Sequence, residues 1–151
     1  MLSLGCSKNT VDSESMASLL QKSGYAGTTG GGNATPITVS SASAFNSAVS
    51  GSDPAIIYVD GFLNVGSVSI GSNKTIVGMG ADAELKGIEL EIKNALNVII
   101  RNLKITGYAG TQDVISVYNS HHVWIDHCTL VDALDGLLDI TSMSNYVTVS
   151  L

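Results

Sequence analysis

Residues 74–149 contain four similar four-residue blocks: Lys74-Thr75-Ile76-Val77, Asn97-Val98-Ile99-Ile100, His122-Val123-Trp124-Ile125 and Tyr146-Val147-Thr148-Val149. The blocks begin 23, 25 and 24 residues apart. β-Branched and other apolar residues dominate them, as is typical of short strands. A repeat of this period indicates a solenoid in which each repeat forms one coil.

A second series of short apolar segments precedes these blocks: Val68-Ser69-Ile70, Leu90-Glu91-Ile92, Ile115-Ser116-Val117 and Leu138-Asp139-Ile140. Each segment alternates as a half-buried strand does. Two strand series that recur together every 22 to 25 residues favour a parallel β-helix with apolar side chains stacked inside the coils. The leucine-rich pattern LxxLxLxxN is absent. Periodicity alone leaves an antiparallel β-sandwich open as the alternative.

The segments around these strands predict turns and short helices. Residues 10–23 and 40–49 carry apolar residues at roughly helical spacing, and Phe45, Ala48 and Val49 of the second segment are placed to cover one end of the solenoid. Asparagines suit the bends between strands and stacked side-chain ladders, and the candidates are Asn73, Asn94, Asn97, Asn119 and Asn145. We therefore expect an all-β parallel β-helix with short N-terminal helices.

The composition excludes several function classes. The 151 residues suit one domain or a part of a larger one, and the net charge is −6. The single arginine, Arg101, and six scattered lysines form no basic cluster, which argues against a nucleic-acid partner. No apolar stretch is long enough for a transmembrane helix, and the N-terminus lacks the pattern of a signal peptide. Cys6 and Cys128 form no CxxC pair.

Residues 25–150 resemble the secreted pectate lyases of polysaccharide lyase family one. The resemblance is carried, in order, by GYAGTTGGG, GSNKTIVGMGADAELKG, NVIIRNLKI, SHHVWIDHCTL and DGLLDI followed by VTVS. It implies a right-handed parallel β-helix, an extracellular setting, calcium, and β-elimination cleavage of polygalacturonate.

Three aspartates form the candidate metal site. Asp113 precedes one strand of the second series, Asp139 lies in the equivalent strand one coil later, and Asp135 precedes Asp139. Carboxylates on one face of coils ~4.8 Å apart repel each other unless a hard cation such as Ca²⁺ lies between them. The resemblance places calcium ligands at Asp113 and Asp139 and a third acid at Asp135, while Thr111 stands where the family often has a further acid. The alternative is that all three are solvated surface residues.

The resemblance assigns proton abstraction to an arginine downstream of the VTVS stretch. We therefore expect this chain to be the N-terminal part of such a β-helix, with no catalytic residue of its own and no activity alone. Arg101 does not match the catalytic motif and is expected to be a structural surface residue.

The block VWIDH contains adjacent acid and base residues. Neighbouring residues on a strand point to opposite faces, so Asp126 and His127 are interpreted as structural polar groups that do not pair directly. Trp124 is expected to pack in the protein. His121 and His122 are only weak evidence for a metal site.

Residues 1–24 do not follow the repeat. LGCSKNTVDSE resembles the N-terminal opening of the radical-SAM methylthiotransferases, in which this cysteine is one of three iron–sulfur ligands. Cys6 has no following partners for such a cluster. We interpret residues 1–24 as an appended helical segment without function, and residues 25–151 as the N-terminal part of a lyase-like β-helix domain.

The function expected from these features is calcium-dependent, pectate lyase-like cleavage of an acidic polysaccharide, outside the cell. The alternatives are another β-helix protein acting on carbohydrate and a non-catalytic β-helix fragment or polyuronate-binding module. We expect no nucleic-acid or membrane partner. Because no capping sequence follows the last strand block, self-association through residues 138–151 is also expected.

Overall fold

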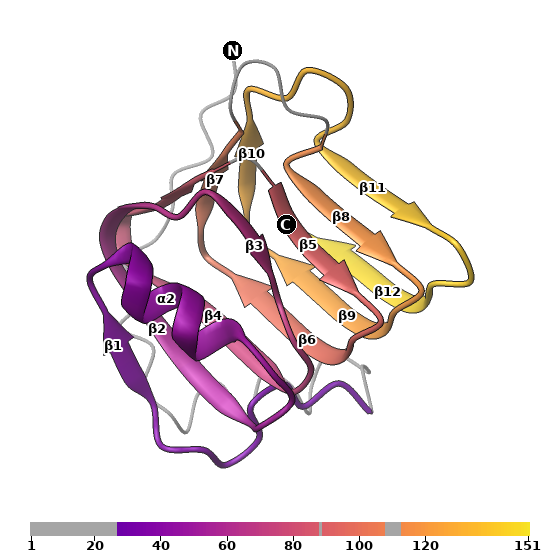
Figure 1. Ribbon diagram of the computed structural model, residues 1–151, viewed down its shortest axis with the longest axis horizontal. Helices are drawn as coiled ribbons and strands as arrows, with labels where there is room; N and C mark the ends of the chain where they lie inside the picture. Colours follow the sequence, from indigo (N-terminus) through magenta and orange to yellow (C-terminus); the bar gives the residue numbers. More distant parts are fainter. Residues whose placement is uncertain (1–26, 88, 108–112) are drawn as a thin grey trace.

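The computed structural model describes residues 27–87, 89–107 and 113–151, which form a solenoid of parallel strands (Figure 1). The larger sheet has the path β1 (Ile37–Val39), β2 (Ala55–Asn64), β4 (Lys74–Lys86), β6 (Leu96–Arg101), β9 (His121–Asp126) and β12 (Asn145–Ser150), and β4 also pairs with β7 (Lys104–Thr106), which pairs with β10 (Thr129–Val131). The smaller sheet has the order β3 (Ser67–Ser69), β5 (Glu89–Lys93), β8 (Ile115–Tyr118) and β11 (Leu138–Thr141). All these pairs are parallel, which confirms the predicted β-helix over the β-sandwich.

The register of the strands follows the period of the sequence. In the larger sheet, one row of paired residues runs through four strands and consists of Ile76, Ile100, Ile125 and Val149. In the smaller sheet, the corresponding row consists of Val68, Leu90, Ile115 and Leu138. These rows join the same positions of successive repeats. Each sequence repeat is therefore one coil of the solenoid.

A third row of strands was missed by the sequence reasoning. It is formed by Leu63, Leu85, Ile105 and Leu130, which lie in register across β2, β4, β7 and β10. Strands β7 and β10 have three residues each, with one apolar residue at the centre. So short a segment carries too little alternation to be recognised by itself, although its recurrence once per coil was a usable signal.

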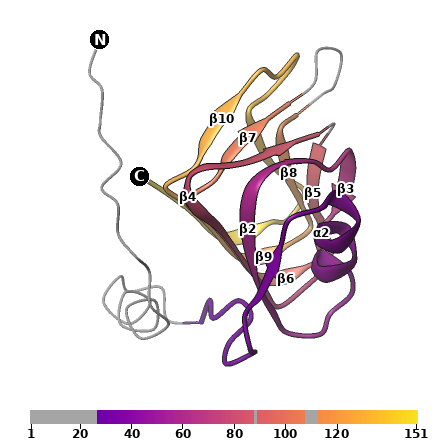
Figure 2. The ribbon, with the colours of Figure 1, turned by 90° about the vertical axis from the view of Figure 1, so that its left-hand side faces the viewer.

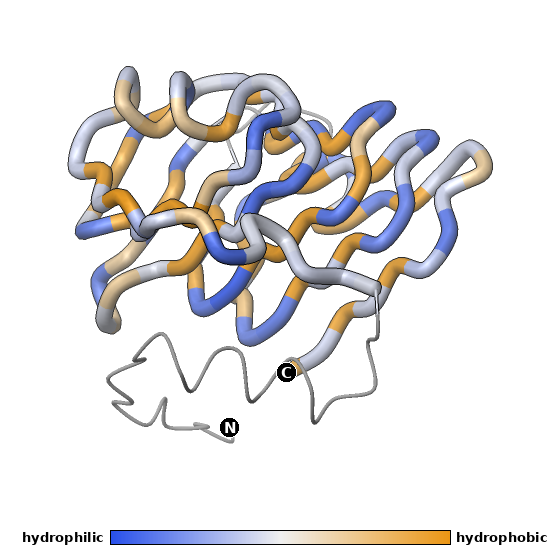
Figure 3. The backbone as a smooth tube through the Cα atoms, turned by 90° about the horizontal axis from the view of Figure 1, so that it is seen from below, coloured by the Kyte–Doolittle hydropathy of each residue, from blue (hydrophilic) through white to orange (hydrophobic). Residues whose placement is uncertain are grey.

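The core lies inside the coils. The inward side chains of the first two rows are almost completely buried in the inner coils, and Ile76, Ile100 and Ile115 have no exposed surface. Burial of such a side chain contributes roughly 1.5–3 kcal/mol. Figure 3 shows hydrophobic and hydrophilic positions alternating along the strands. This alternation leaves every second side chain of a strand on the outer face, where a site can form.

Asparagines make several of the bends between strands. Asn73, Asn94, Asn97 and Asn119 have positive φ, a conformation that asparagine adopts more readily than most residues. They also form two ladders, in which Asn97 Nδ2 donates to Asn73 Oδ1 at 3.0 Å and Asn119 Nδ2 donates to Asn94 Oδ1 at 2.8 Å. The fifth candidate, Asn145, does not share this conformation and is the first residue of β12.

One end of the solenoid is covered by helix α2 (Ala42–Val49), close to its predicted position. Ser41 caps the helix, since its Oγ accepts a hydrogen bond from Ala44 N at 3.3 Å. Phe45 and Val49 are completely buried against the first coil (Figures 1 and 2). The helix expected at residues 10–23 lies outside the described residues. No helix in the described part of the chain is long and apolar enough to cross a membrane.

Candidate functional site

The outer face of the smaller sheet carries a row of small and acidic residues. Ser69, Glu91, Ser116 and Asp139 lie in register on four successive strands, and we call them the acidic row. Ser69 Oγ donates to Glu91 Oε2 at 2.8 Å. Asp139 is exposed, and the inward positions on either side of it continue the core rows. The β-helix therefore directs Asp139 away from the core.

Asp113 and Asp135 lie outside this row, in the segments that precede β8 and β11. Asp113 is half-buried, and its Oδ1 accepts a hydrogen bond from Gly136 N at 3.0 Å. Asp135 is exposed and precedes Gly136 in the chain. Asp139 lies in register with Ser116, three residues after Asp113, so it does not stack on Asp113.

These carboxylates meet some of the requirements of a site for a hard cation, but not all of them. Asp135 and Asp139 form no hydrogen bond or ion pair with another described residue, which leaves their oxygens available. Carboxylate oxygens are the ligands that Ca²⁺ prefers. However, the described residues contain no group of three His, Cys, Asp or Glu side chains close enough to hold a metal ion. Thr111, the expected weak point of the site, lies outside them. Substrate oxygens and water would have to complete the coordination.

A second row lies two residues further along the same strands. Lys93, Tyr118 and Thr141 are in register and are exposed. The Lys93 ammonium lies 5.4 Å from the centre of the Tyr118 ring and 3.5 Å from Glu91 Oε1. We call Lys93 and Tyr118 the Lys–Tyr pair. It places a positive charge and an aromatic surface next to the acidic row.

A different polar cluster occupies the outer face of the larger sheet. Arg101, Asp126 and Ser150 lie in register on β6, β9 and β12. Arg101 Nε forms an ion pair with Asp126 Oδ2 at 2.7 Å, and Ser150 Oγ donates to Asp126 Oδ1 at 2.6 Å. The Arg101 side chain is only 17% exposed. Arg101 therefore has a structural contact as expected, and it lies on the outer face with most of its side chain covered.

His127 also contacts this cluster. Its Nδ1 lies 2.8 Å from Asp126 Oδ1, so the expectation that the two residues do not pair is wrong. The physical reason is that β9 ends at Asp126 and His127 has a φ of 49°, in the left-handed region. Alternation of side chains holds only within a strand. The contact lies on the larger sheet, whereas the acidic row lies on the smaller sheet.

Two further residues near this cluster have no catalytic role in the structure. Trp124 packs as expected: it is 5% exposed, and its Nε1 donates to Ser150 Oγ at 2.9 Å. Burial raises the pKa of the Cys128 thiol to about 11. The thiol is thus neutral at ordinary pH and is a poor metal ligand or nucleophile.

The two adjacent histidines contact each other rather than a set of ligands. His121 Nδ1 and His122 Nδ1 are 2.8 Å apart, and the His122 ring lies 4.8 Å from the Tyr146 ring. No third His, Cys, Asp or Glu joins them among the described residues. The pair is therefore explained by its own hydrogen bond.

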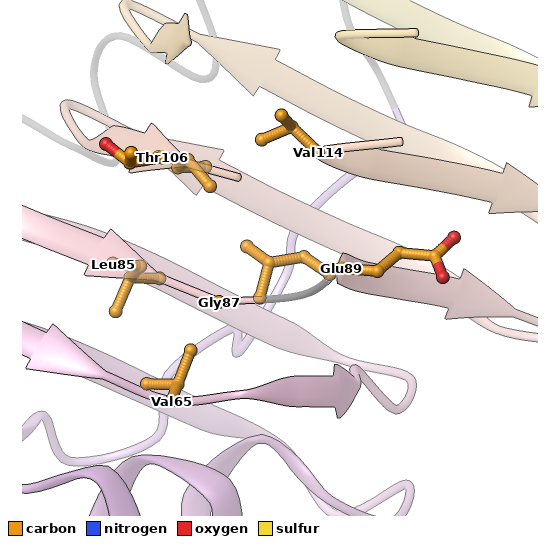
Figure 4. A pocket seen from close by; sticks show the side chains of 8 residues that line it. Val65, Leu85, Gly87, Glu89, Thr106 and Val114 are labelled. Atoms are coloured by element: carbon orange, nitrogen blue, oxygen red, sulfur yellow. The ribbon is translucent and has the colours of Figure 1, made fainter. Parts of the chain in front are cut away.

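Two hollows lined by described residues offer no alternative site. The one in Figure 4 has about 170 Å³ of empty volume between Val65, Leu85 and Val114 and leaves no space for a water molecule. The Glu89 carboxylate points away from it. A broader depression with about 620 Å³ of empty volume lies between residues 29–34 and the ladder of Asn73 and Asn97. The Asn97 side chain is already used there, because its Oδ1 accepts from Thr29 N and Gly30 N.

The solenoid of parallel coils places this chain in the class of parallel β-helix proteins, and the acidic row lies on the outer face of its smaller sheet. The sequence model of the family described as "Pectate lyase" matches residues 7–151, and the chain belongs to this family. The match begins inside the segment 1–24, and the boundary expected at residue 24 stays a prediction.

Individual relatives support the same assignment. A probable pectate lyase A of Aspergillus niger is 48% identical over 141 residues, which cover 84% of this chain and 44% of the relative. A pectate trisaccharide-lyase of Thermotoga maritima is 46% identical over 107 residues, which cover 63% of this chain and 29% of the relative. The chain therefore spans less than half the length of these relatives.

Solved structures show the same architecture. A Bacillus pectate lyase in complex with trigalacturonate is 27% identical and superimposes with a TM-score of 0.71 over 82% of this chain and 48% of that one. A pectate lyase II from Xanthomonas campestris is 28% identical, with a TM-score of 0.63 over 83% of this chain and 49% of that one.

Proposed function

We propose that this chain forms the cation-binding and substrate-binding part of a lyase that cleaves polygalacturonate by calcium-assisted β-elimination. The observation that carries the proposal is the exposed acidic face at Asp135 and Asp139, whose carboxylates have no partner among the described residues. The family relation supports the reaction class, and a relative bound to trigalacturonate supports an acidic oligosaccharide as substrate.

The residues of the face have distinct roles in this proposal. Asp139 presents its carboxylate outward from β11, and Asp135 presents a second one from the preceding segment. Asp113 is oriented by the Gly136 amide, which leaves its other oxygen for a ligand. Bound Ca²⁺ would neutralise the uronate carboxylate and the negative charge that develops when the α-proton is removed.

Proton removal needs a group other than Arg101. Arg101 is held by Asp126 on the larger sheet, whereas the acidic row lies on the smaller sheet. The only basic side chain at the outward positions of β3, β5, β8 and β11 is Lys93. The family's base is expected downstream of the VTVS stretch, so the complete lyase activity is proposed for a longer protein that contains this part.

A non-catalytic polyuronate-binding role is the second candidate. The same acidic face supports it, because binding of Ca²⁺ and a polyuronate chain needs no base. An activity assay separates the two candidates. A protein that contains this chain is incubated with polygalacturonate, and the formation of unsaturated uronide is measured by its ultraviolet absorbance.

Calcium binding tests the shared part of both candidates. Isothermal titration calorimetry of the chain with Ca²⁺ is expected to give a dissociation constant at or above ~10⁻⁴ M, because few carboxylates are supplied. The substitution Asp139→Ala should abolish the heat of binding. Asp60→Ala, at an exposed aspartate of β2, is the matched control and should leave it unchanged. Equal binding by the Asp139→Ala variant and the wild type would contradict the assignment.

Two further expectations stay proposals. Secretion is proposed from the family resemblance.

Self-association through β11 and β12 is proposed because Ile140, Met143 and Tyr146 are 42%, 84% and 72% exposed. Size-exclusion chromatography with light scattering tests it, and a monomer at high concentration would contradict it.

A further inference from the structure

The Lys–Tyr pair is not explained by the stability of the fold. Lys93 is 49% exposed as a side chain, and Tyr118 is 43% exposed. Exposed ion pairs and exposed cation–π contacts each contribute little to folding. Glu91, the acid next to Lys93, already accepts a hydrogen bond from Ser69. Both side chains are nevertheless exposed enough for a ligand to reach them.

The surroundings of the pair select an anionic ligand. Lys93 is the one base at the outward positions of the smaller sheet, and it lies next to a row that contains Glu91 and Asp139. A polyuronate chain carries a carboxylate on every sugar. The carboxylates that do not reach a cation held by the aspartates must be solvated or must meet another positive charge. Lys93 supplies that charge on the same face.

The aromatic ring adds the second half of the recognition. Tyr118 stands in register with Lys93 on the next strand, so the ring and the ammonium face the same ligand position. An exposed tyrosine ring offers an apolar surface for the C–H face of a sugar and a hydroxyl for a hydrogen bond. The contacts of Lys93 with Tyr118 and Glu91 restrict its side chain before binding, which reduces the entropy lost on binding.

We infer that Lys93 and Tyr118 form a binding position for a single uronate unit, in which Lys93 pairs with the sugar carboxylate and Tyr118 packs on the ring. This inference rests on the proposed function and extends it to the specificity of the face. A free carboxylate forms a charge-assisted hydrogen bond with an ammonium, whereas a methyl ester does not. The pair thus makes the face selective for demethylated polyuronate.

The test is binding of trigalacturonate and of its methyl ester to the full chain in excess Ca²⁺, measured by calorimetry. Lys93→Met is expected to weaken binding of the acid about fivefold and to leave the ester unchanged, which removes most of the selectivity. Tyr118→Ala should weaken both ligands about equally.

Lys104→Met is the matched control. Lys104 has a 48% exposed side chain and an ion pair with Glu84 at 3.2 Å, but it lies in β7 of the other sheet. Its variant should bind both ligands as the wild type does.

The outcomes separate the two levels of the proposal. Equal loss of binding in the Lys93→Met and Lys104→Met variants, or no loss in either, overturns the Lys–Tyr inference while the proposed function stands. A wild-type chain that binds neither ligand with Ca²⁺ overturns the proposed function and this inference with it. Circular dichroism of each variant shows that the coils are intact.

Discussion

Asp126 and Asp139 are aspartates on the outer faces of the two sheets, but their surroundings differ completely. The side chain of Asp126 is 4% exposed and is surrounded by Arg101, Ser150 and His127. Asp139 is exposed and has no partner among the described residues. A carboxylate that is already neutralised and hydrogen-bonded has nothing left for a ligand, whereas an unpartnered one does. The comparison therefore supports a structural role for Asp126 and agrees with the binding role proposed for Asp139.

The largest effect is expected at Asp126. Asp126→Ala removes the carboxylate that pairs with the poorly solvated Arg101, and loss of one member of a buried pair costs about 3 kcal/mol. Urea denaturation followed by circular dichroism measures the loss. Asp139→Ala is the control and should change stability by less than about 0.5 kcal/mol, because it is a surface substitution. Equal losses in the two variants would break the comparison.

Lys74 extends the comparison to a cation. It is fully buried, and its Nζ donates to the carbonyl oxygens of Gly51, Asp53 and Ser72 at 3.1, 2.6 and 2.8 Å. Burial lowers the pKa of Lys74, and the charge of Asp53 partly offsets this. Lys74→Met leaves three carbonyls without their donor and should cost about 2 kcal/mol in chemical denaturation.

The exposed Lys104 again provides the control for Lys74. Lys104→Met removes only a surface ion pair and should cost less than about 1 kcal/mol. A Lys74→Met variant as stable as Lys104→Met would show that the hydrogen bonds from the buried Lys74 ammonium to the segment around Gly51 do not stabilise the fold.

Calcium should stabilise the fold only through the aspartates of the proposed site. With a dissociation constant of ~10⁻⁴ M, ~1 mM Ca²⁺ adds about 1.4 kcal/mol to the free energy of unfolding. The Asp139→Ala variant should show none of this gain, and the Asp60→Ala variant should keep it. Thermal denaturation with and without Ca²⁺ measures the difference, and a gain retained in Asp139→Ala would contradict the site.

Glu84 lies between these two cases, because its carboxylate is partly exposed but has a hydrogen bond from Thr106 and an ion pair with Lys104. The hydrogen bond from Thr106 Oγ1 at 2.7 Å lowers the pKa of Glu84, and Lys104 adds to this. A carboxyl whose pKa is lowered by folding stabilises the fold above its unfolded pKa, and the effect is lost as the pH falls through the folded pKa. Thr106→Val should therefore cost about 0.5 kcal/mol at neutral pH.

The pH dependence checks the cause. The difference in stability between the wild type and Thr106→Val should begin to shrink as the pH falls below the unfolded pKa of a glutamate, about 4.3, and should be lost as the pH falls through the lowered pKa of Glu84 in the folded wild type. Denaturation curves at neutral and acidic pH measure it. A difference that does not change with pH would assign the effect to packing of Thr106 alone.

The sequence by itself determined the coil. The recurrence of two apolar segments predicted the rows that contain Ile100 and Ile115, because each inward side chain must stack on its equivalent in the next coil. The asparagine bends followed from the same repeat, with Asn145 as the exception. The third row around Ile105 escaped notice since its strands are too short to show alternation.

Only the tertiary structure decided which polar side chains are available. The alternation of a strand predicts that Arg101, Asp126 and Asp139 point outward, but it does not say what lies beside them. Their neighbours come from coils about one repeat away, and from backbone turns such as the left-handed residue His127. The Lys–Tyr pair likewise joins residues 25 positions apart. These neighbours determine whether a charged side chain is held in the fold or can bind a ligand. A local sequence pattern does not identify them.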